Sequence, residues 1–256
     1  MGAEALEKVS LYWLCHLPEA GALQIRRIGE LAGSFREAYY IEGTQILENQ
    51  LIIYRLTKNN ASGSYEENAY RFDNWKKEFS RLEEEYYRLS EKGIRFITPL
   101  DADYPKRLYS VYDYPMGLYI KGELPAEDRA TAAVIGARNC TAYGRETADY
   151  MGRELAAAGV QVISGMALGI DGAGHEGALV GGGKTYAVLG CGVDQCYPRS
   201  NYELYESIPF HGGLISEYSL KTPPVPRNFP VRNRIISGLS DVILVIEAKE
   251  KSGSLI

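Results

Sequence analysis

Three short apolar runs between residues 131 and 201 constrain the fold most, because each of them ends in a glycine turn. The runs, with the turns that follow them, are Ala132–Ile135 with Gly136, Val160–Ile163 with Ser164-Gly165, and Thr185–Leu189 with Gly190. Short runs rich in Val and Ile, separated by helical patterns, are typical of buried parallel strands in an α/β sheet. The glycine turns are therefore expected at the carboxyl ends of neighbouring strands.

That edge of an open α/β sheet is where ligands bind, because helix N-termini and backbone N–H groups converge there and favour anions. Arg138 follows the first turn, and Arg199 follows the third after Tyr197 and Pro198. These residues predict a phosphate-binding edge, with a mononucleotide, a dinucleotide or a nucleic acid all left open as the ligand.

Hydrophobic periodicity predicts two domains. A helical N-terminal domain is expected over residues 1–92, with several short helices over 4–60 and a long polar helix over 65–92. The second domain, 93–256, is expected to be a mostly parallel sheet with helices on both faces. Its remaining elements are edge strands at 94–97 and 117–122, helices at 145–158, through His175 to Leu179 and at 201–208, and strands at 213–216 and 242–247.

The segment from Leu17 to Leu31 is reminiscent of a helix-hairpin-helix, whose glycine turn holds a DNA phosphate. The second glycine of that turn is missing, which favours a plain helical packing module over a DNA clamp.

Composition excludes several classes of protein. A chain of 256 residues with 45% hydrophobic and 24% charged residues is ordinary for a globular protein, and its net charge of −5 argues against nonspecific coating of nucleic acid. Residues 219–240 nevertheless hold four cations and no acid, so a local positive field is expected there. The four cysteines have no zinc-type spacing, so no metal site is predicted. Neither a leader nor a long apolar run is visible, so no membrane association and a cytoplasmic location are expected.

Six motifs follow one another in the second half of the chain. They are Ile135-Gly136-Ala137-Arg138, Ser164-Gly165-Met166-Ala167-x-Gly169-Ile170-Asp171-x-x-x-His175, Val188-Leu189-Gly190-Cys191-Gly192-Val193-Asp194-x-x-Tyr197-Pro198, Leu214-Ile215-Ser216-Glu217-Tyr218, Phe229-Pro230-x-Arg232-Asn233-Arg234-Ile235-Ile236-x-Gly238-Leu239-Ser240 and Glu247-Ala248-x-x-x-Ser252-Gly253-Ser254-Leu255-Ile256. From about Phe96 to Ile256 this series resembles the DNA-processing protein A (DprA/Smf) family.

The resemblance implies a Rossmann-like, homodimeric protein without catalytic turnover, catalytic residues or a cofactor. Such a protein binds single-stranded DNA, protects incoming DNA and loads a RecA-type recombinase in natural transformation. The resemblance also implies where DNA is bound, with Arg138 and Arg199 as the main cations. Further DNA-binding residues would be Gly136, which leaves the backbone open, Ser164 and Gly165, which offer a hydroxyl and an N–H group, and Arg232, Asn233 and Arg234 as the other wall.

Several of these residues have structural alternatives. Arg138 could instead pair with Glu217 or Glu247, and one of Arg232 and Arg234 is expected to bind an acid. Tyr197 could stack on a base or simply pack. Asp171 is interpreted as a helix N-cap, because aspartate is a preferred N-cap residue. His175 is interpreted as a structural histidine, with its ring hydrogen-bonded inside the protein.

The rival function is a nucleotide-binding enzyme that hydrolyses nucleoside monophosphates. Its signature, Pro-Gly-Gly-x-Gly-Thr-x-x-Glu, does not occur at residues 247–254, where it would be expected. A dinucleotide dehydrogenase is disfavoured because Gly-x-Gly-x-x-Gly with a following ribose-binding acid is missing. The family pattern continues beyond Ser-Gly-Ser-Leu-Ile, so the sheet is expected to lack one strand.

Overall fold

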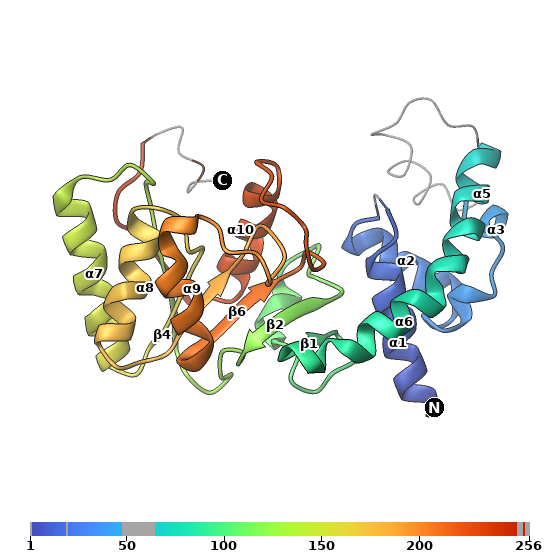
Figure 1. Ribbon diagram of the computed structural model, residues 1–256, viewed down its shortest axis with the longest axis horizontal. Helices are drawn as coiled ribbons and strands as arrows, with labels where there is room; N and C mark the ends of the chain where they lie inside the picture. The colour runs from blue at the N-terminus through green and yellow to red at the C-terminus, as the bar shows by residue number, and fades with distance from the viewer. Residues whose placement is uncertain (1, 19, 48–64, 250–252, 254–256) are drawn as a thin grey trace. The chain divides into compact units, whose positions relative to one another are not determined.

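The computed structural model describes residues 2–18, 20–47, 65–249 and 253, and these form two compact units (Figure 1). The first unit comprises Met1–Lys92, Thr98–Ala102 and Pro115–Gly117. The second comprises Gly93–Ile97, Asp103–Tyr114 and Leu118–Ile256. Two short segments beyond residue 92 thus belong to the first unit, and the division into domains of residues 1–92 and 93–256 stays a prediction.

The first unit is helical. Its elements are α1 (Ala3–Cys15), α2 (Ala22–Ala32), η1 (Glu37–Tyr39), α3 (Gly43–Leu47), α5 (Tyr65–Trp75), η2 (Lys76–Glu78), α6 (Phe79–Arg88) and η3 (Ser90–Lys92). The helix expected over 65–92 is therefore broken by a 3-10 turn at η2. Its apolar stripe faces the core, where the ring of the fully buried Trp13 lies 5.8 Å from Phe72 and 5.9 Å from Phe79. The helices expected within 48–60 lie outside the described residues.

The turn between α1 and α2 does not present its glycine N–H group. The Gly21 N–H group donates to Gln24 Oε1 at 2.9 Å, which completes a cap for α2. Because that donor is satisfied internally, the geometry favours the packing module over a phosphate clamp.

The second unit contains one seven-stranded sheet in the order β1-β2-β6-β5-β4-β3-β7. The strands are β1 (Ile94–Ile97), β2 (Leu118–Gly122), β3 (Thr131–Ile135), β4 (Gln161–Ser164), β5 (Thr185–Val188), β6 (Gly212–Ser216) and β7 (Val242–Val245). From β6 to β7 all pairs are parallel, while β1 and β2 add to the β6 side as antiparallel strands. The mostly parallel α/β sheet and its added edge strands are confirmed.

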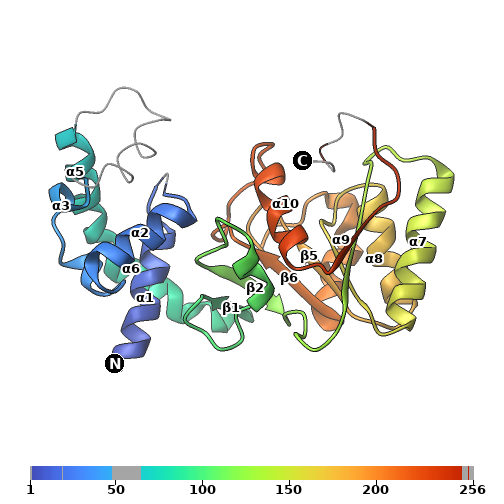
Figure 2. The ribbon, with the colours of Figure 1, turned by 180° about the vertical axis from the view of Figure 1, so that it is seen from behind.

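Helices cover both faces of this sheet (Figures 1 and 2). On one face, Val134 and Val162 pack with α7 (Ala142–Ala157) and α8 (Ile170–Val180), and α9 (Tyr202–Ser207) lies beside α8. On the other, Ala133 and Ile163 pack with α10 (Asn228–Gly238) and the 3-10 turn η4 (Lys106–Ser110). Successive strand residues serve opposite layers because side chains alternate across a sheet.

The helix α10 was not predicted from the sequence. Its apolar side, Ile235, Ile236 and Leu239, packs on the sheet with Leu108 and Ile215. At the far edge of the sheet, the β7 side chains Val242, Ile243 and Val245 are 42–50% exposed. None of the helices in the described residues is long and apolar enough to cross a membrane.

Candidate nucleic-acid interface

The glycine turns lie side by side at the carboxyl edge of the sheet. The register pairs Ala133 with Ile163 and Ser164 with Ala187, so the ends of β3, β4 and β5 stand next to one another. The parallel arrangement predicted from the apolar runs therefore does bring Gly136, Gly165 and the Gly190 turn together.

The carboxylate of Asp171 occupies the backbone donors of two of these turns. Its Oδ1 accepts from the Gly136 N–H group at 3.3 Å, and its Oδ2 accepts from the Gly165 N–H group at 3.2 Å. Asp171 is only 6% exposed and is the second residue of α8, whereas Gly169 is the N-cap. The N-cap interpretation was wrong, and the predicted open N–H groups already bind an internal anion. Burial raises the pKa of the Asp171 carboxyl, opposed by Arg232 and by these backbone N–H groups.

The hydroxyl of Ser164 is also engaged. Ser164 is fully buried, and its Oγ donates to the Val134 carbonyl oxygen at 2.6 Å, linking β4 to β3. A DNA contact by Gly136, Ser164 or Gly165 stays a prediction, and it would require these internal hydrogen bonds to be exchanged.

Arg232 is a buried arginine on the sheet-facing side of α10. It is 4% exposed, and its Nη1 donates to the Gly165 carbonyl oxygen at 3.0 Å and to the Val188 carbonyl oxygen. Its guanidinium is thus used to hold the ends of β4 and β5 together from the other face of the sheet.

Arg234 binds two acids. Its Nη2 donates to both carboxylate oxygens of Glu217 at 2.8 Å, and its Nε lies 3.1 Å from Asp113 Oδ2 without a well-directed hydrogen bond. Of Arg232 and Arg234, it is therefore Arg234 that binds an acid, as was expected of one of the two. Both acids come from outside residues 219–240, so the acid-free segment is less positive than predicted.

Asn233 points in a third direction, and its Nδ2 donates to the Gly253 carbonyl oxygen at 3.0 Å. Three consecutive helical residues are about 100° apart around the axis, so they cannot form one wall together. A DNA contact by Arg232, Asn233 and Arg234 stays a prediction, and the internal hydrogen bonds that these side chains make would have to be exchanged for it.

Arg138 remains exposed at the edge, and its guanidinium lies over the Phe229 ring, 5.1 Å from the ring centre. The Phe229 ring in turn lies 5.5 Å from that of Tyr197 at an interplanar angle of 34°. We call Arg138, Phe229 and Tyr197 the aromatic–arginine cluster. It borders a shallow hollow of about 40 Å³ that is lined by Arg138, Gly165, Ala167, Leu168, Tyr197, Pro198 and Phe229.

The two acids suggested as partners of Arg138 are used elsewhere. Glu217 binds Arg234, and Glu247 Oε2 accepts from the Thr141 N–H group at 3.0 Å and from its hydroxyl at 2.8 Å. Within the described residues Arg138 has no ion pair, so its charge is available to a ligand.

The loop that carries Tyr197 and Arg199 is held beside the β4 turn by Asn201. The Asn201 Nδ2 donates to the carbonyl oxygens of Met166 at 3.0 Å and Ala167 at 3.2 Å. Arg199 is exposed and has no acid partner among the described residues, and Tyr197 is 40% exposed while packing on Phe229. Tyr197 thus packs on Phe229 and keeps part of its ring exposed, and stacking on a base stays a prediction.

His175 is a structural histidine, as interpreted. It is fully buried, its Nδ1 lies 2.7 Å from Thr185 Oγ1, and that hydroxyl donates to the Val162 carbonyl oxygen. Thr185 therefore accepts from a protonated Nδ1, and burial lowers the pKa of His175 to about 3. Sequence reasoning missed Phe229 and Asn201 as site residues, although both stand inside or beside quoted motifs. No cluster of three or more potential metal ligands occurs in the part of the chain that the structure describes.

Known proteins are similar to this chain in sequence and in fold. The model of the family DNA recombination-mediator protein A matches residues 95–256. The chain is 40% identical over 167 residues to the DNA processing protein DprA of Bacillus subtilis, covering 65% of this chain and 56% of that one. It is 44% identical over 168 residues to the protein Smf of Escherichia coli, covering 65% of this chain and 45% of that one. The chain thus spans about half the length of the curated relatives it matches.

Two solved structures are similar as well. The DNA processing protein A of Streptococcus pneumoniae superposes with a TM-score of 0.74 at 29% identity, covering 98% of this chain and 80% of that chain. The DNA processing protein A of Helicobacter pylori, from a structure concerned with its single-stranded DNA binding mode, gives a TM-score of 0.57 at 34% identity over 62% of this chain and 73% of that one. With the family model covering more than half of its length, the chain belongs to the DNA recombination-mediator protein A family.

Proposed function

We propose that this chain binds single-stranded DNA at the carboxyl edge of its sheet, through the aromatic–arginine cluster and Arg199. The observation that carries the proposal is the exposed Arg138 guanidinium held 5.1 Å over the Phe229 ring, with Tyr197 alongside. The single-stranded DNA binding of the Helicobacter pylori relative supports the choice of ligand.

The chemistry of the cluster suits an unpaired strand. Aromatic faces stack on bases whatever their identity, and a duplex does not offer its bases in this way. Arginine adds a planar fork that binds two phosphate oxygens at once. Because Asp171 and Arg232 hold the glycine turns internally, the ligand is recognised by side chains on the rim and not by a backbone cradle.

The proposed role is binding without turnover. Among the described residues that line the hollow there is no carboxylate, and the nearby Asp171 is sealed against Gly136 and Gly165. A nucleoside monophosphate hydrolase needs a carboxylate that reaches its substrate, so this lining disfavours it. Release of free adenine from AMP by the purified protein would revive that alternative.

The wider role follows from the family. We propose that the chain works as a homodimer that protects incoming DNA and loads a RecA-type recombinase in natural transformation. Membership of the recombination-mediator family supports this role.

The test is fluorescence anisotropy with a labelled oligothymidylate at two salt concentrations. The double variant Arg138→Ala, Arg199→Ala is expected to lose at least tenfold in affinity and to show a shallower salt dependence. The control is Arg95→Ala, Arg153→Ala, which removes the same charge from two exposed arginines that pair with Asp103 and Asp149. Equal affinities for the two double variants would refute the proposed site.

A further inference from the structure

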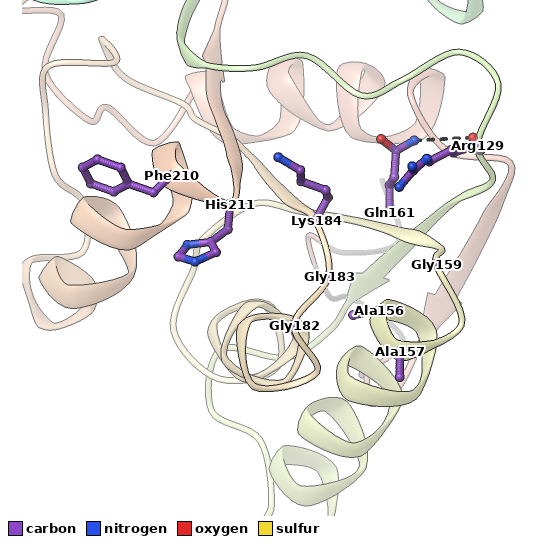
Figure 3. A pocket seen from close by; sticks show the side chains of 10 residues that line it. All are labelled: Arg129, Ala156, Ala157, Gly159, Gln161, Gly182, Gly183, Lys184, Phe210 and His211. Carbon is purple, nitrogen blue, oxygen red and sulfur yellow. Dashed lines mark hydrogen bonds between the residues drawn. The ribbon is translucent and has the colours of Figure 1, made fainter.

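A second hollow lies at the opposite, amino-terminal edge of the sheet (Figure 3). It has a volume of about 330 Å³, within the range of small-ligand pockets. Gln161 at the start of β4, Lys184 just before β5 and His211 just before β6 place it beneath the amino ends of three neighbouring strands. It is thus separate from the aromatic–arginine cluster, which stands at the carboxyl ends.

The hollow is a consequence of how two helices end. Both α7 and α8 are followed by glycines, of which Gly159 has φ +80° and Gly182 has φ +72°, a backbone conformation that favours glycine. No atom lies within 4 Å of the place where either residue would carry a Cβ atom. Together with Ala156 and Ala157 they leave a floor of small groups in which space stays open.

The lining is basic in an acidic protein. Arg129, Lys184 and His211 line the hollow, and none of its ten lining residues is acidic, although the chain carries a net charge of −5. The guanidinium of the exposed Arg129 has no acid partner among the described residues. Lys184 Nζ lies 2.8 Å from Glu123 Oε2. The two side chains are 38% and 64% exposed, so water screens this ion pair and a ligand can replace Glu123.

The C-terminal ends of α7 and α8 lie near the hollow, but they repel a bound anion only weakly. Helix C-termini carry partial negative charge, but Gly159 N–H donates to the Ala156 carbonyl oxygen at 3.0 Å and Gly182 N–H donates to that of Leu179 at 3.1 Å. These bonds satisfy carbonyl groups near the hollow. The full positive charge of Arg129, joined by that of Lys184 when a ligand replaces Glu123, outweighs the partial charge that remains.

We propose that this hollow is a second anion site, which takes a phosphate ester of about nucleotide size. Arg129 and Lys184 bind the phosphate oxygens, and His211 lines the same hollow. The amide of Gln161 is already bonded to Ala126 and Tyr186, so it offers little to a base, and recognition is expected to be tolerant of base identity. The phosphate ester can come from a free nucleotide or from the end of a DNA strand, and the site itself does not depend on the function proposed above.

The test measures binding of dTMP to the whole chain by isothermal titration calorimetry. Arg129→Gln and Lys184→Gln are each expected to weaken dTMP binding at least tenfold. Ala157→Leu is expected to weaken it similarly by filling the floor, since Ala157 is exposed and its replacement touches neither the core nor a charge. Arg95→Gln, at an exposed arginine that pairs with Asp103, is the control that should leave dTMP binding unchanged, and circular dichroism should show every variant folded.

A second arm compares oligothymidylates with and without a 5′-phosphate. Binding of dTMP that is lost in the three variants supports a free nucleotide as the source. A preference for the phosphorylated oligothymidylate that is lost in the same variants, without dTMP binding, supports a strand end. Absence of both in the wild type, or binding that Arg129→Gln, Lys184→Gln and Ala157→Leu leave unchanged, overturns the proposal.

Discussion

Asp171 and Arg232 hold the same residue, Gly165, from opposite faces of the sheet. Asp171 in α8 accepts from the Gly165 N–H group at 3.2 Å, and Arg232 in α10 donates to its carbonyl oxygen at 3.0 Å. A Cβ atom on Gly165 would lie 2.5 Å from Arg232 Nη1 and 2.7 Å from Asp171 Oδ2, so a larger residue there would displace one of these two side chains. The turn after β4 is thereby tied to both helical layers.

Removing Asp171 should therefore be severe. Asp171→Ala leaves a buried arginine without its compensating charge and two glycine N–H groups without an acceptor, which should cost roughly 3–5 kcal/mol in the free energy of unfolding. Urea unfolding measures this loss. The double variant Asp171→Ala, Arg232→Met should lose much less than the sum of the two single changes, and strictly additive losses would contradict the coupling.

Gly190 should matter through Phe229. A Cβ atom on Gly190 would lie 2.8 Å from Phe229 Cδ1, so Gly190→Ala should displace the ring from beneath Arg138. Loss of a stacking ring is worth about 1–3 kcal/mol per base, so affinity for oligothymidylate should fall at least fivefold. Anisotropy measures it, and Phe229→Leu should fall comparably. In the Phe229→Leu background Gly190→Ala should have little further effect, and an undiminished second loss would show that Gly190 acts by another route.

Glu217 should contribute to the stability of the fold but not to the affinity for DNA. Glu217→Ala deprives the half-buried Arg234 of a bidentate partner, which should lower the free energy of unfolding by roughly 3 kcal/mol. Thermal or urea unfolding measures that loss. Oligothymidylate affinity at a temperature where the variant is folded should stay within twofold of the wild type, and a large drop would show that the position of Arg234 matters for DNA binding.

His175 should make stability depend on pH in one direction. The pKa of His175 is about 3 in the folded protein and near 6.5 in the unfolded chain. Below pH 6.5 the His175 ring is therefore protonated in the unfolded chain but stays neutral in the folded protein. The contribution of neutral His175 is complete above that pH and is lost as the pH falls toward 3, at up to about 1.4 kcal/mol per pH unit. Between pH 7.5 and 5 the wild type should lose about 2 kcal/mol more than His175→Gln. Urea midpoints at both pH values test this, and parallel losses would exclude it.

Much of the sheet was predictable because burial shows in the residue pattern itself. The strand expected at 185–189 is found as β5 at Thr185–Val188, and that at 94–97 is found as β1 with the same ends. Both segments are short apolar runs bounded by turn residues, and few structures other than a buried strand fit that pattern. The helix α10 gave no such signal, because Arg232 lies on its buried side and interrupts the apolar periodicity.

The candidate site was predictable in its position and less so in its contacts. Arg138 and Arg199 stand exposed at the predicted edge, whereas Ser164 and the N–H groups of Gly136 and Gly165 are engaged internally. A motif identifies which residues meet at an edge, but it does not show which of two nearby groups, a ligand or Asp171, satisfies a given donor.

By itself, the order of apolar runs and glycine turns determined a parallel α/β sheet and the edge where its turns meet, because strand burial and backbone turns are local properties. Only the tertiary structure decided which partner each charged residue binds. Arg232 and Arg234 stand two positions apart, yet one holds carbonyl groups inside the protein and the other binds Glu217. Among the residues that the structure describes, Arg138 has no ion pair, because Glu217 and Glu247 bind Arg234 and Thr141 instead. Electrostatic pairing depends on distances across the fold, and those distances exist only once the layers have packed.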